Sequence, residues 1–216
     1  MRLFFLLTIC LLTTQLSAAE FRHGDVKLIQ DGFKKADTPA WLPEAGVLLF
    51  TDLELGKLYQ YVPGGSVEVL CESASRGKTG PDGKFVGVFD GSIAAYDPGG
   101  TPKPIVGQEQ IGREISLNDL TIGKTGRIYF TTLKDPEKGR LSLVNPQDKS
   151  VTVLFDGEKE ETLWNPNGVA LSPDEKFLYV GISSYKNRKY SGVYRFPIRE
   201  TGMLDIEAGK AERWAP

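Results

Sequence analysis

One pattern of apolar and polar positions occurs four times along the chain. Each occurrence begins with a turn that contains Gly or Asp, continues into a short strand rich in aromatic and β-branched residues, and ends in a second short strand. Such residues favour a pleated, half-buried surface. The predicted strand pairs are residues 47–52 with 57–61, 84–88 with 92–97, 127–131 with 140–144, and 176–180 with 192–196.

The spacing of these repeats indicates the architecture. Their turns are 37 to 49 residues apart and lie at Gly46, Gly83, Gly126 and Glu175. A unit of roughly 40–50 residues is typical of propeller blades. Because no stretch of this region has a long apolar period of 3.6 residues, we expect little helix. The pattern therefore predicts an all-β fold, a β-propeller over residues 20–216 with about four to five blades at about 43 residues per blade.

The first 19 residues have the features of a secretory signal peptide. Met1 and Arg2 make a positive start, residues 3–12 are apolar, and small residues end at Ala19. This order predicts cleavage after Ala19 and a secreted or periplasmic protein. A buried N-terminal helix is the alternative interpretation. No later segment is apolar enough to span a membrane, so we expect no membrane anchor after cleavage.

A short run at residues 26–30 precedes the first repeat. In a closed propeller, a strand from the N-terminal end can complete the last blade and remove an exposed sheet edge. We expect this run to be such a strand.

The rare residues and the charge exclude several classes of function. The chain has 1 His and 2 Cys, too few for a Cys/His zinc site. Removal of the signal would remove Cys10 and leave Cys71 without an intrachain disulfide partner. The net charge of -2 gives no basic footprint for nucleic acid. Any chemistry is expected to rest on carboxylates, amides, hydroxyls or a metal held by oxygen.

Four polar residues are candidates for a shared site. The first strand of a propeller blade lines the central channel. Asn118 and Asp119 open one such predicted strand, Asn167 opens another, and Asp37 lies ahead of the first repeat. Their oxygen-bearing side chains are therefore expected to converge on one axis and form a ligand site. The alternative is a turn role, since Asn is common in loops for its tolerance of unusual backbone angles.

Three segments resemble one known family. They are residues 36–41 with 48–52, residues 116–120 with 126–131, and residues 165–176 with 178–180. Together they resemble the signatures of the senescence marker protein/gluconolactonase/luciferin-regenerating-enzyme (regucalcin-like) family. The resemblance covers roughly residues 30–200. It implies a six-bladed propeller that hydrolyses sugar lactones, a class of carboxylic ester, with a divalent metal in the central channel.

The resemblance also implies roles for individual residues. Asp37 and Asn167 match two metal ligands, and Asn118 with Asp119 matches a pair beside the substrate. The metal would be Ca²⁺, Mg²⁺, Mn²⁺ or Zn²⁺. A further Asp, both a ligand and the general base, is expected beyond Pro216, so no catalytic residue is identified within the chain and we expect weak metal binding.

Two departures from the family pattern bear on these roles. The family usually has Glu where this chain has Asp37. Its earlier Asn-Gly strand has no recognisable match in residues 76–80.

Two other functions stay open at this point. One is a non-catalytic propeller that binds a sugar or another small ligand. The other is a metal-free propeller similar to strictosidine synthase, against which the Asn-Asp and Asn-Gly signatures argue. The sequence indicates a small sugar lactone as partner and does not indicate an oligomeric state.

Overall fold

The computed structural model describes residues 26–112, 116–133, 139–156, 165–183, 190–205 and 212–215. The predicted signal peptide lies outside these residues. The chain divides into two units, Met1–Asp31 and Gly32–Pro216, and the described strands all belong to the second unit.

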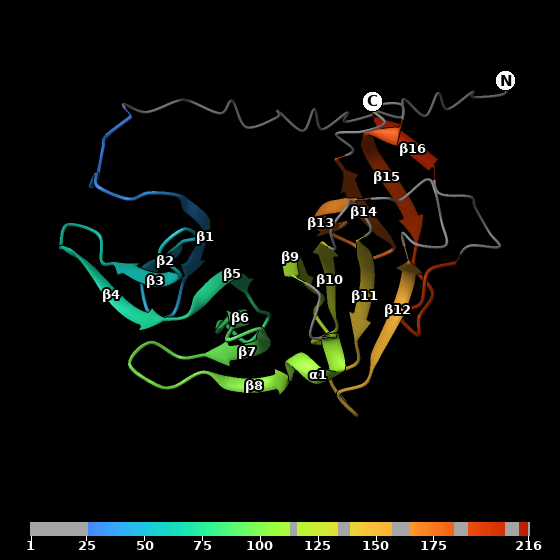
Figure 1. Cartoon of the computed structure of the whole chain (residues 1–216), viewed down its shortest axis with the longest axis horizontal. Coiled ribbons are helices and arrows are strands. Elements are labelled where there is room, and N and C mark those ends of the chain that lie inside the picture. The colour runs from blue at the N-terminus through green and yellow to red at the C-terminus, as the bar shows by residue number, and fades with distance from the viewer. Residues whose placement is uncertain are drawn as a thin grey trace, which may run out of the picture. The chain divides into compact units, whose positions relative to one another are not determined.

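The second unit contains four antiparallel sheets of four strands each, and every sheet takes its strands in chain order (Figure 1). The first sheet consists of β1 (Ala36–Leu42), β2 (Val47–Asp52), β3 (Lys57–Tyr61) and β4 (Val67–Glu72). The second consists of β5 (Ala74–Thr79), β6 (Phe85–Phe89), β7 (Ser92–Tyr96) and β8 (Lys103–Val106). The third consists of β9 (Ser116–Ile122), β10 (Ile128–Leu133), β11 (Arg140–Val144) and β12 (Val151–Asp156). The fourth consists of β13 (Pro166–Leu171), β14 (Phe177–Ile182), β15 (Gly192–Pro197) and β16 (Glu212–Ala215).

The first strands of successive sheets are neighbours. Strand β1 contacts β5, β5 contacts β9, and β9 contacts β13. Figure 1 shows the other strands of each sheet following outward from these four. This arrangement is propeller-like, and it confirms the prediction that the first strands approach a common centre.

Alternation of side chains in the central strands joins the sheets into one core. Phe85 of β6 packs in the cluster shared with the first sheet, whereas its neighbour Val86 packs in the cluster shared with the third. Tyr129 and Phe130 of β10 divide in the same way between the fourth and second sheets. Successive strand residues point to opposite faces. A strand between two clusters therefore carries large apolar side chains on both of its faces.

The predicted strand pairs correspond to the two middle strands of each sheet, with boundaries that agree within two residues. The all-β prediction also holds for the described residues, whose only helix is the short α1 (Gln108–Ile111). Among these same residues, no helix has the length and apolar character that a membrane span requires.

The prediction of a strand at residues 26–30 is wrong. This stretch has no strand structure, and Val26, Leu28 and Ile29 are exposed. An extended run becomes a strand only when its backbone N–H and C=O groups find a partner strand. Each described sheet is instead built from its own consecutive strands.

Candidate functional site

Four neighbouring first strands enclose a cavity of about 380 Å³. It is lined by Asp37, Thr38, Pro39, Arg76, Gly77, Lys78, Asp119 and Asn167. These residues come from β1, β5, β9 and β13, one group from each sheet. The structure thus brings together three of the four predicted site residues, namely Asp37, Asp119 and Asn167.

Each of these four strands has a register shift at the cavity. Against its partner strand, one extra residue is inserted between Asp37 and Ala40 in β1, Ala74 and Gly77 in β5, Leu117 and Asp119 in β9, and Pro166 and Val169 in β13. A β-bulge of this kind leaves the extra residue out of the ladder and re-aims the nearby side chains. The same backbone device therefore presents polar groups to the cavity in all four sheets.

The bulge of β1 is held by the residues that follow Asp37. Thr38 has a φ of 49°, a left-handed conformation that is strained for a β-branched residue. Its N–H donates to Asp37 Oδ1 at 2.6 Å, and its Oγ1 lies 2.7 Å from Thr51 Oγ1. Pro39 has no N–H, so the shift leaves no backbone donor unpaired at that residue. These contacts fix one carboxylate oxygen of Asp37, while no hydrogen bond within the described residues engages Oδ2.

Asp119 ties the third sheet to the fourth. Its Oδ1 accepts the N–H of Leu120 at 2.9 Å, and its Oδ2 accepts the N–H of Val169 in β13 at 2.9 Å. Lys78 Nζ of β5 lies 3.6 Å from Oδ1. Bonds from backbone N–H to a carboxylate are among the stronger hydrogen bonds in proteins. Asp119 therefore holds the bulge of β13 in position, besides lining the cavity.

Thr131 makes a second link to the β13 bulge. This residue is fully buried, and its Oγ1 donates to the backbone oxygen of Asn167 at 2.5 Å. The same Oγ1 accepts the N–H of Asp119 at 3.2 Å. Together with the bond from Val169 to Asp119, this link fixes the backbone on both sides of Gly168.

The oxygens of Asp37 and Asn167 fit a hard divalent cation in chemical type. Asn167 Nδ2 donates to Ser183 Oγ at 3.5 Å. Asn167 Oδ1 accepts no hydrogen bond from any other described residue. Carboxylate and amide oxygens are the ligands that Ca²⁺ and Mg²⁺ prefer. In the described part of the chain no group of three or more His, Cys, Asp or Glu could hold a metal. Among the described lining residues, Asp37 and Asn167 are the two with a side-chain oxygen that no hydrogen bond engages, since both oxygens of Asp119 accept backbone N–H groups.

Asn118 is placed differently from the other three predicted residues. It lies in the bulge of β9 and is only 3% exposed, and the cavity lining includes its neighbour Asp119 instead. Its buried Nδ2 has no hydrogen-bond partner among the described residues. An unsatisfied buried amide costs about 1–3 kcal/mol. Contact between Asn118 and a substrate stays a prediction.

The sequence-based analysis missed Arg76 and Lys78 as site residues. Their strand, β5, is too polar to show an apolar alternation, and its packing instead depends on glycine. Gly77 pairs with Gly87, and a Cβ at Gly77 would collide with the Phe85 ring and lie 2.7 Å from the backbone oxygen of Val86. One signal was available: Arg76 precedes Gly83 by seven residues, as Asp119 precedes Gly126.

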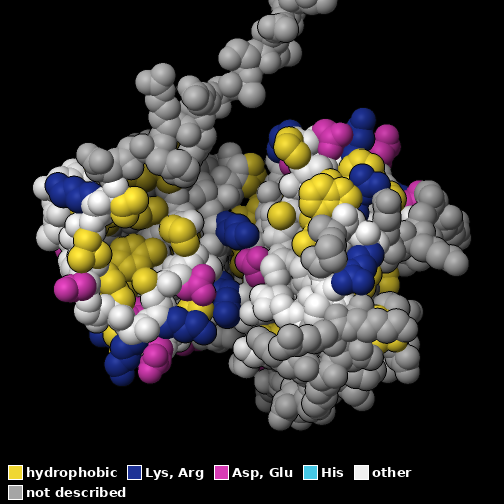
Figure 2. Space-filling view, turned by 90° about the horizontal axis from the view of Figure 1, so that it is seen from above, with side chains coloured by type: hydrophobic (Ala, Val, Ile, Leu, Met, Phe, Trp, Pro, Cys, Tyr) yellow, Lys and Arg dark blue, Asp and Glu magenta, His cyan; other side chains and the backbone are white. Residues whose placement is uncertain are grey.

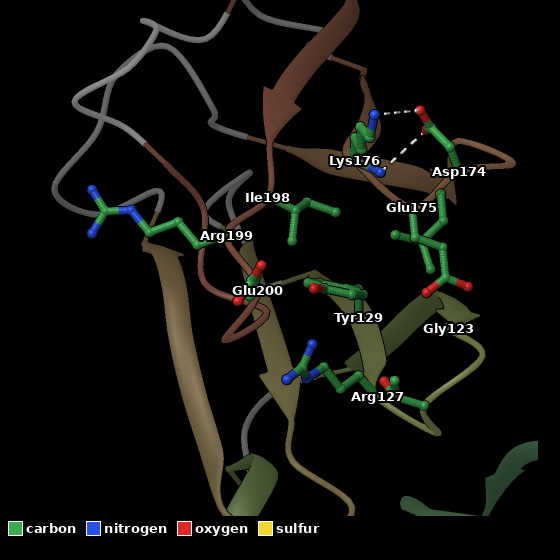
Figure 3. A pocket seen from close by; sticks show the side chains of 11 residues that line it. Gly123, Arg127, Tyr129, Asp174, Glu175, Lys176, Ile198, Arg199 and Glu200 are labelled. Carbon is green, nitrogen blue, oxygen red and sulfur yellow. Dashed lines mark hydrogen bonds and ion pairs between the residues drawn. The ribbon is translucent and has the colours of Figure 1, made fainter.

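A second cavity, of about 220 Å³, lies at the other ends of β9, β10, β13 and β15 (Figure 3). Two of its polar groups serve the turns that surround it. Glu175 Oε1 accepts the N–H of Lys124 at 2.7 Å, and the Tyr129 hydroxyl donates to the backbone oxygen of Gly202 at 2.8 Å. Burial raises the pKa of Tyr129 to about 12. None of the predicted site residues is in this lining, so the first cavity is the candidate site.

Comparison with known proteins identifies the family of the chain. Residues 36–206 match the family model described as SMP-30/Gluconolactonase/LRE-like region. A gluconolactonase of Zymomonas mobilis is 28% identical over 206 residues, which cover 82% of this chain and 56% of that protein. The chain therefore spans little more than half the length of this relative.

Solved structures with the same fold come from related proteins. A gluconolactonase from Xanthomonas campestris has a TM-score of 0.67 at 23% identity, covering 81% of this chain and 61% of that one. The calcium-binding protein regucalcin from Agrobacterium tumefaciens has a TM-score of 0.65 at 20% identity, covering 84% of this chain and 59% of that one. With most of its length matched by the family model, the chain belongs to the SMP-30/gluconolactonase/LRE-like family.

Proposed function

We propose that this protein is a hydrolase of sugar lactones that uses a hard divalent cation, built on a propeller of the six-bladed type. The observation that carries the proposal is the convergence of Asp37, Asp119 and Asn167 on one cavity from three separate sheets. The activity of the Zymomonas mobilis relative, a gluconolactonase, supports the substrate class.

In this proposal Asp37 and Asn167 hold the cation. Each has a side-chain oxygen that no hydrogen bond within the described residues engages, and both line the cavity. Regucalcin from Agrobacterium tumefaciens is a calcium-binding protein, and it supports a divalent cation in this fold. The proposed cation is Ca²⁺, Mg²⁺, Mn²⁺ or Zn²⁺. Once bound, such an ion polarises the carbonyl of the lactone.

Asn118 and Asp119 are proposed to contact the sugar. Each carboxylate oxygen of Asp119 accepts one backbone N–H and can accept a further bond from a sugar hydroxyl, because a carboxylate oxygen has two acceptor sites. The unpaired Nδ2 of Asn118 is a donor that a sugar oxygen could satisfy. The proton of the attacking water goes to a general base. The family resemblance implies that this base is an Asp beyond Pro216, which stays a prediction.

The direct test is a pH-stat assay of the protein expressed from its complete coding sequence, on D-glucono-δ-lactone with and without added Ca²⁺, Mg²⁺, Mn²⁺ or Zn²⁺. Proton release faster than spontaneous ring opening, and lost on chelation, is the expected result. If a panel of sugar lactones shows no acceleration with any of the metals, the proposal is wrong. Isothermal titration with each metal measures the proposed site independently of turnover, with Asp37→Asn as the comparison.

A second candidate is a propeller that binds a sugar lactone or its acid without chemistry. The observation that favours it is the state of Asp119, whose two oxygens already accept backbone N–H groups and whose Oδ1 faces Lys78. A carboxylate held in this way is a good structural anchor. Saturable binding of gluconate without any turnover of lactone would select this candidate.

Export is the remaining part of the proposal. The support is the order of positive start, apolar stretch and small residues in positions 1–19. N-terminal sequencing of protein purified from the native host tests it. A mature chain beginning at Glu20, found outside the cytoplasm, is expected, and an intact Met1 on a cytoplasmic protein would contradict it.

A further inference from the structure

Two basic side chains from β5 lie in the candidate site. Arg76 and Lys78 both line the cavity, on either side of Gly77. In Figure 2 basic and acidic side chains lie next to each other in the hollow near the centre of the view. A site for a neutral sugar has no evident need for two cations, so their presence asks for an explanation.

The two cations differ in their partners. Lys78 Nζ is 3.6 Å from Asp119 Oδ1, and this pair balances one positive charge with one negative. Arg76 is half-buried and has no ion pair within the described residues. The guanidinium is thus a charge at the cavity wall that the described residues leave unpaired.

The summed charge of the cavity lining also favours an anionic ligand. Arg76 and Lys78 carry two positive charges, and Asp37 and Asp119 carry two negative ones. A divalent cation on Asp37 and Asn167, as the proposed function requires, would make the loaded cavity net positive. Such a cavity attracts and selects an anionic ligand.

The backbone holds Arg76 firmly where it could meet a substrate. It lies in the β5 bulge between Ala74 and Gly77, and β5 contacts both β1 and β9. The fully buried ring of Phe85 packs over Gly77 directly behind it. A group bound between Asp37 and Asp119 would therefore have Arg76 at its side.

We propose that the substrates of this site are sugar lactones with an anionic substituent, a carboxylate or a phosphate, and that Arg76 binds this substituent. A planar guanidinium can form two parallel hydrogen bonds to either group, a geometry that a lysine ammonium cannot match. The inference rests on the proposed function for the reaction itself. It adds the substrate class and a specificity-determining residue.

The test compares kcat/KM of the full chain for three lactones. D-glucono-δ-lactone is neutral, D-glucaro-1,4-lactone carries a carboxylate, and 6-phospho-D-glucono-δ-lactone carries a phosphate. An anionic lactone should be preferred by roughly 10- to 100-fold, the range expected for a charge-assisted pair of hydrogen bonds. Whichever anion is favoured identifies the substituent.

Arg76→Gln should abolish this preference by lowering kcat/KM for the anionic lactones to about the value for the neutral lactone, and Arg76→Lys should keep only part of it. Arg127→Gln, in the lining of the other cavity, is the matched control and should leave the preference intact. An equal preference in wild type and Arg76→Gln, or no preference in the wild type, would overturn the inference. Urea unfolding of each variant shows that the comparison is made on folded protein.

A binding measurement separates failure of this inference from failure of the proposed function. Isothermal titration with gluconate, glucarate and 6-phosphogluconate should show tighter binding of glucarate or 6-phosphogluconate, which carry a second anionic group, and this advantage should be lost in Arg76→Gln. Arg76-dependent binding without hydrolysis of any lactone would contradict the proposed hydrolase and still support an anionic ligand at this site. Hydrolysis of the neutral lactone together with equal affinity for all three acids would support the proposed hydrolase and contradict the role of Arg76 in binding an anionic substituent.

Discussion

The two cavities lie toward opposite ends of β9 and β13, and several of their polar groups are used in different ways. In the candidate site, Asp37, Arg76 and Asn167 come from bulged strands of different sheets and keep polar atoms that no described residue engages. In the other cavity, Glu175 binds the backbone of the neighbouring turn, and Tyr129 binds the loop at Gly202. A hollow lined by charged residues is thus no evidence of a site on its own. The clearest difference is that the candidate site gathers polar groups from four sheets, whereas the lining of the other cavity comes from the third and fourth sheets and the turns beside them.

Bulges account for much of this difference. Along a regular strand every backbone group is paired and side chains alternate between two faces. An extra residue interrupts that alternation and turns a polar side chain away from the core. The strand ends around the second cavity have no such register shift. Polar residues there, such as Glu175, bond to the backbone of the turns instead.

The largest expected effect comes from neutralising one carboxylate in the candidate site and comparing it with a variant that neutralises one carboxylate in the other cavity. Asp37→Asn should lower kcat/KM for the preferred lactone by about 100-fold, because the cation loses its anionic ligand. Asp174→Asn, in the other lining, should change it by less than about threefold, since this residue bonds to Ser172 and Lys176 within its own turn. A pH-stat assay at saturating metal measures both. Similar losses in the two variants would contradict the assignment of the site.

A stability experiment tests the backbone of the β5 bulge. Gly77→Ala should lower the free energy of unfolding by about 2 kcal/mol, because the new Cβ collides with the Phe85 ring and the backbone at Val86. Gly168→Ala is the control, since the nearest atom its Cβ would meet is Asp119 Oδ2 at 3.8 Å, and it should cost less than about 1 kcal/mol. Urea unfolding followed by Trp fluorescence measures both changes. An equal cost would mean that the close packing of β5 is not what stabilises this strand.

The link between the third and fourth sheets can be broken at one hydroxyl. Thr131→Val keeps the volume but removes the bonds to the Asn167 carbonyl and the Asp119 N–H, at a cost of about 1–2 kcal/mol. Metal affinity should fall with it, because Asn167 loses its anchor. Thr125→Val, exposed at the other cavity, should change neither quantity. If Thr131→Val weakens the fold and leaves metal affinity unchanged, the hydroxyl does not position Asn167.

The smallest effect is expected at Tyr129, whose hydroxyl serves the fold alone. Its pKa of about 12 exceeds that of an unfolded tyrosine, so the unfolded state loses its proton first as the pH rises above about 10. The stability contributed by the neutral hydroxyl is complete below pH 10 and falls between pH 10 and about 12.

Tyr129→Phe should reduce that alkaline decline and cost about 1 kcal/mol at pH 7, with lactone turnover unchanged. Unfolding free energies at several alkaline pH values measure it. Loss of turnover in this variant would show that the second cavity also takes part in function.

Particular elements show what could be predicted from sequence. The middle strands of each sheet were predictable because their apolar alternation reflects the two faces they bury. Asp37, Asp119 and Asn167 were found because they lie at or ahead of the predicted first strands and because their flanking motifs resemble a family. The run at residues 26–30 shows the limit of prediction from sequence, because a short apolar run forms a strand only when its backbone finds a partner strand. Arg76 and Lys78 were missed because β5 packs through glycines and an aromatic ring from the next strand.

The sequence by itself determined the repeat, the antiparallel pairing within each repeat and the family, because these depend on local patterns and short motifs. Only the tertiary structure decided which polar residues share one cavity. That outcome depends on the bulges, which are a property of two paired strands, and on bonds between sheets such as that from Val169 to Asp119. Residues 50 positions apart meet there through backbone geometry that neither segment encodes alone.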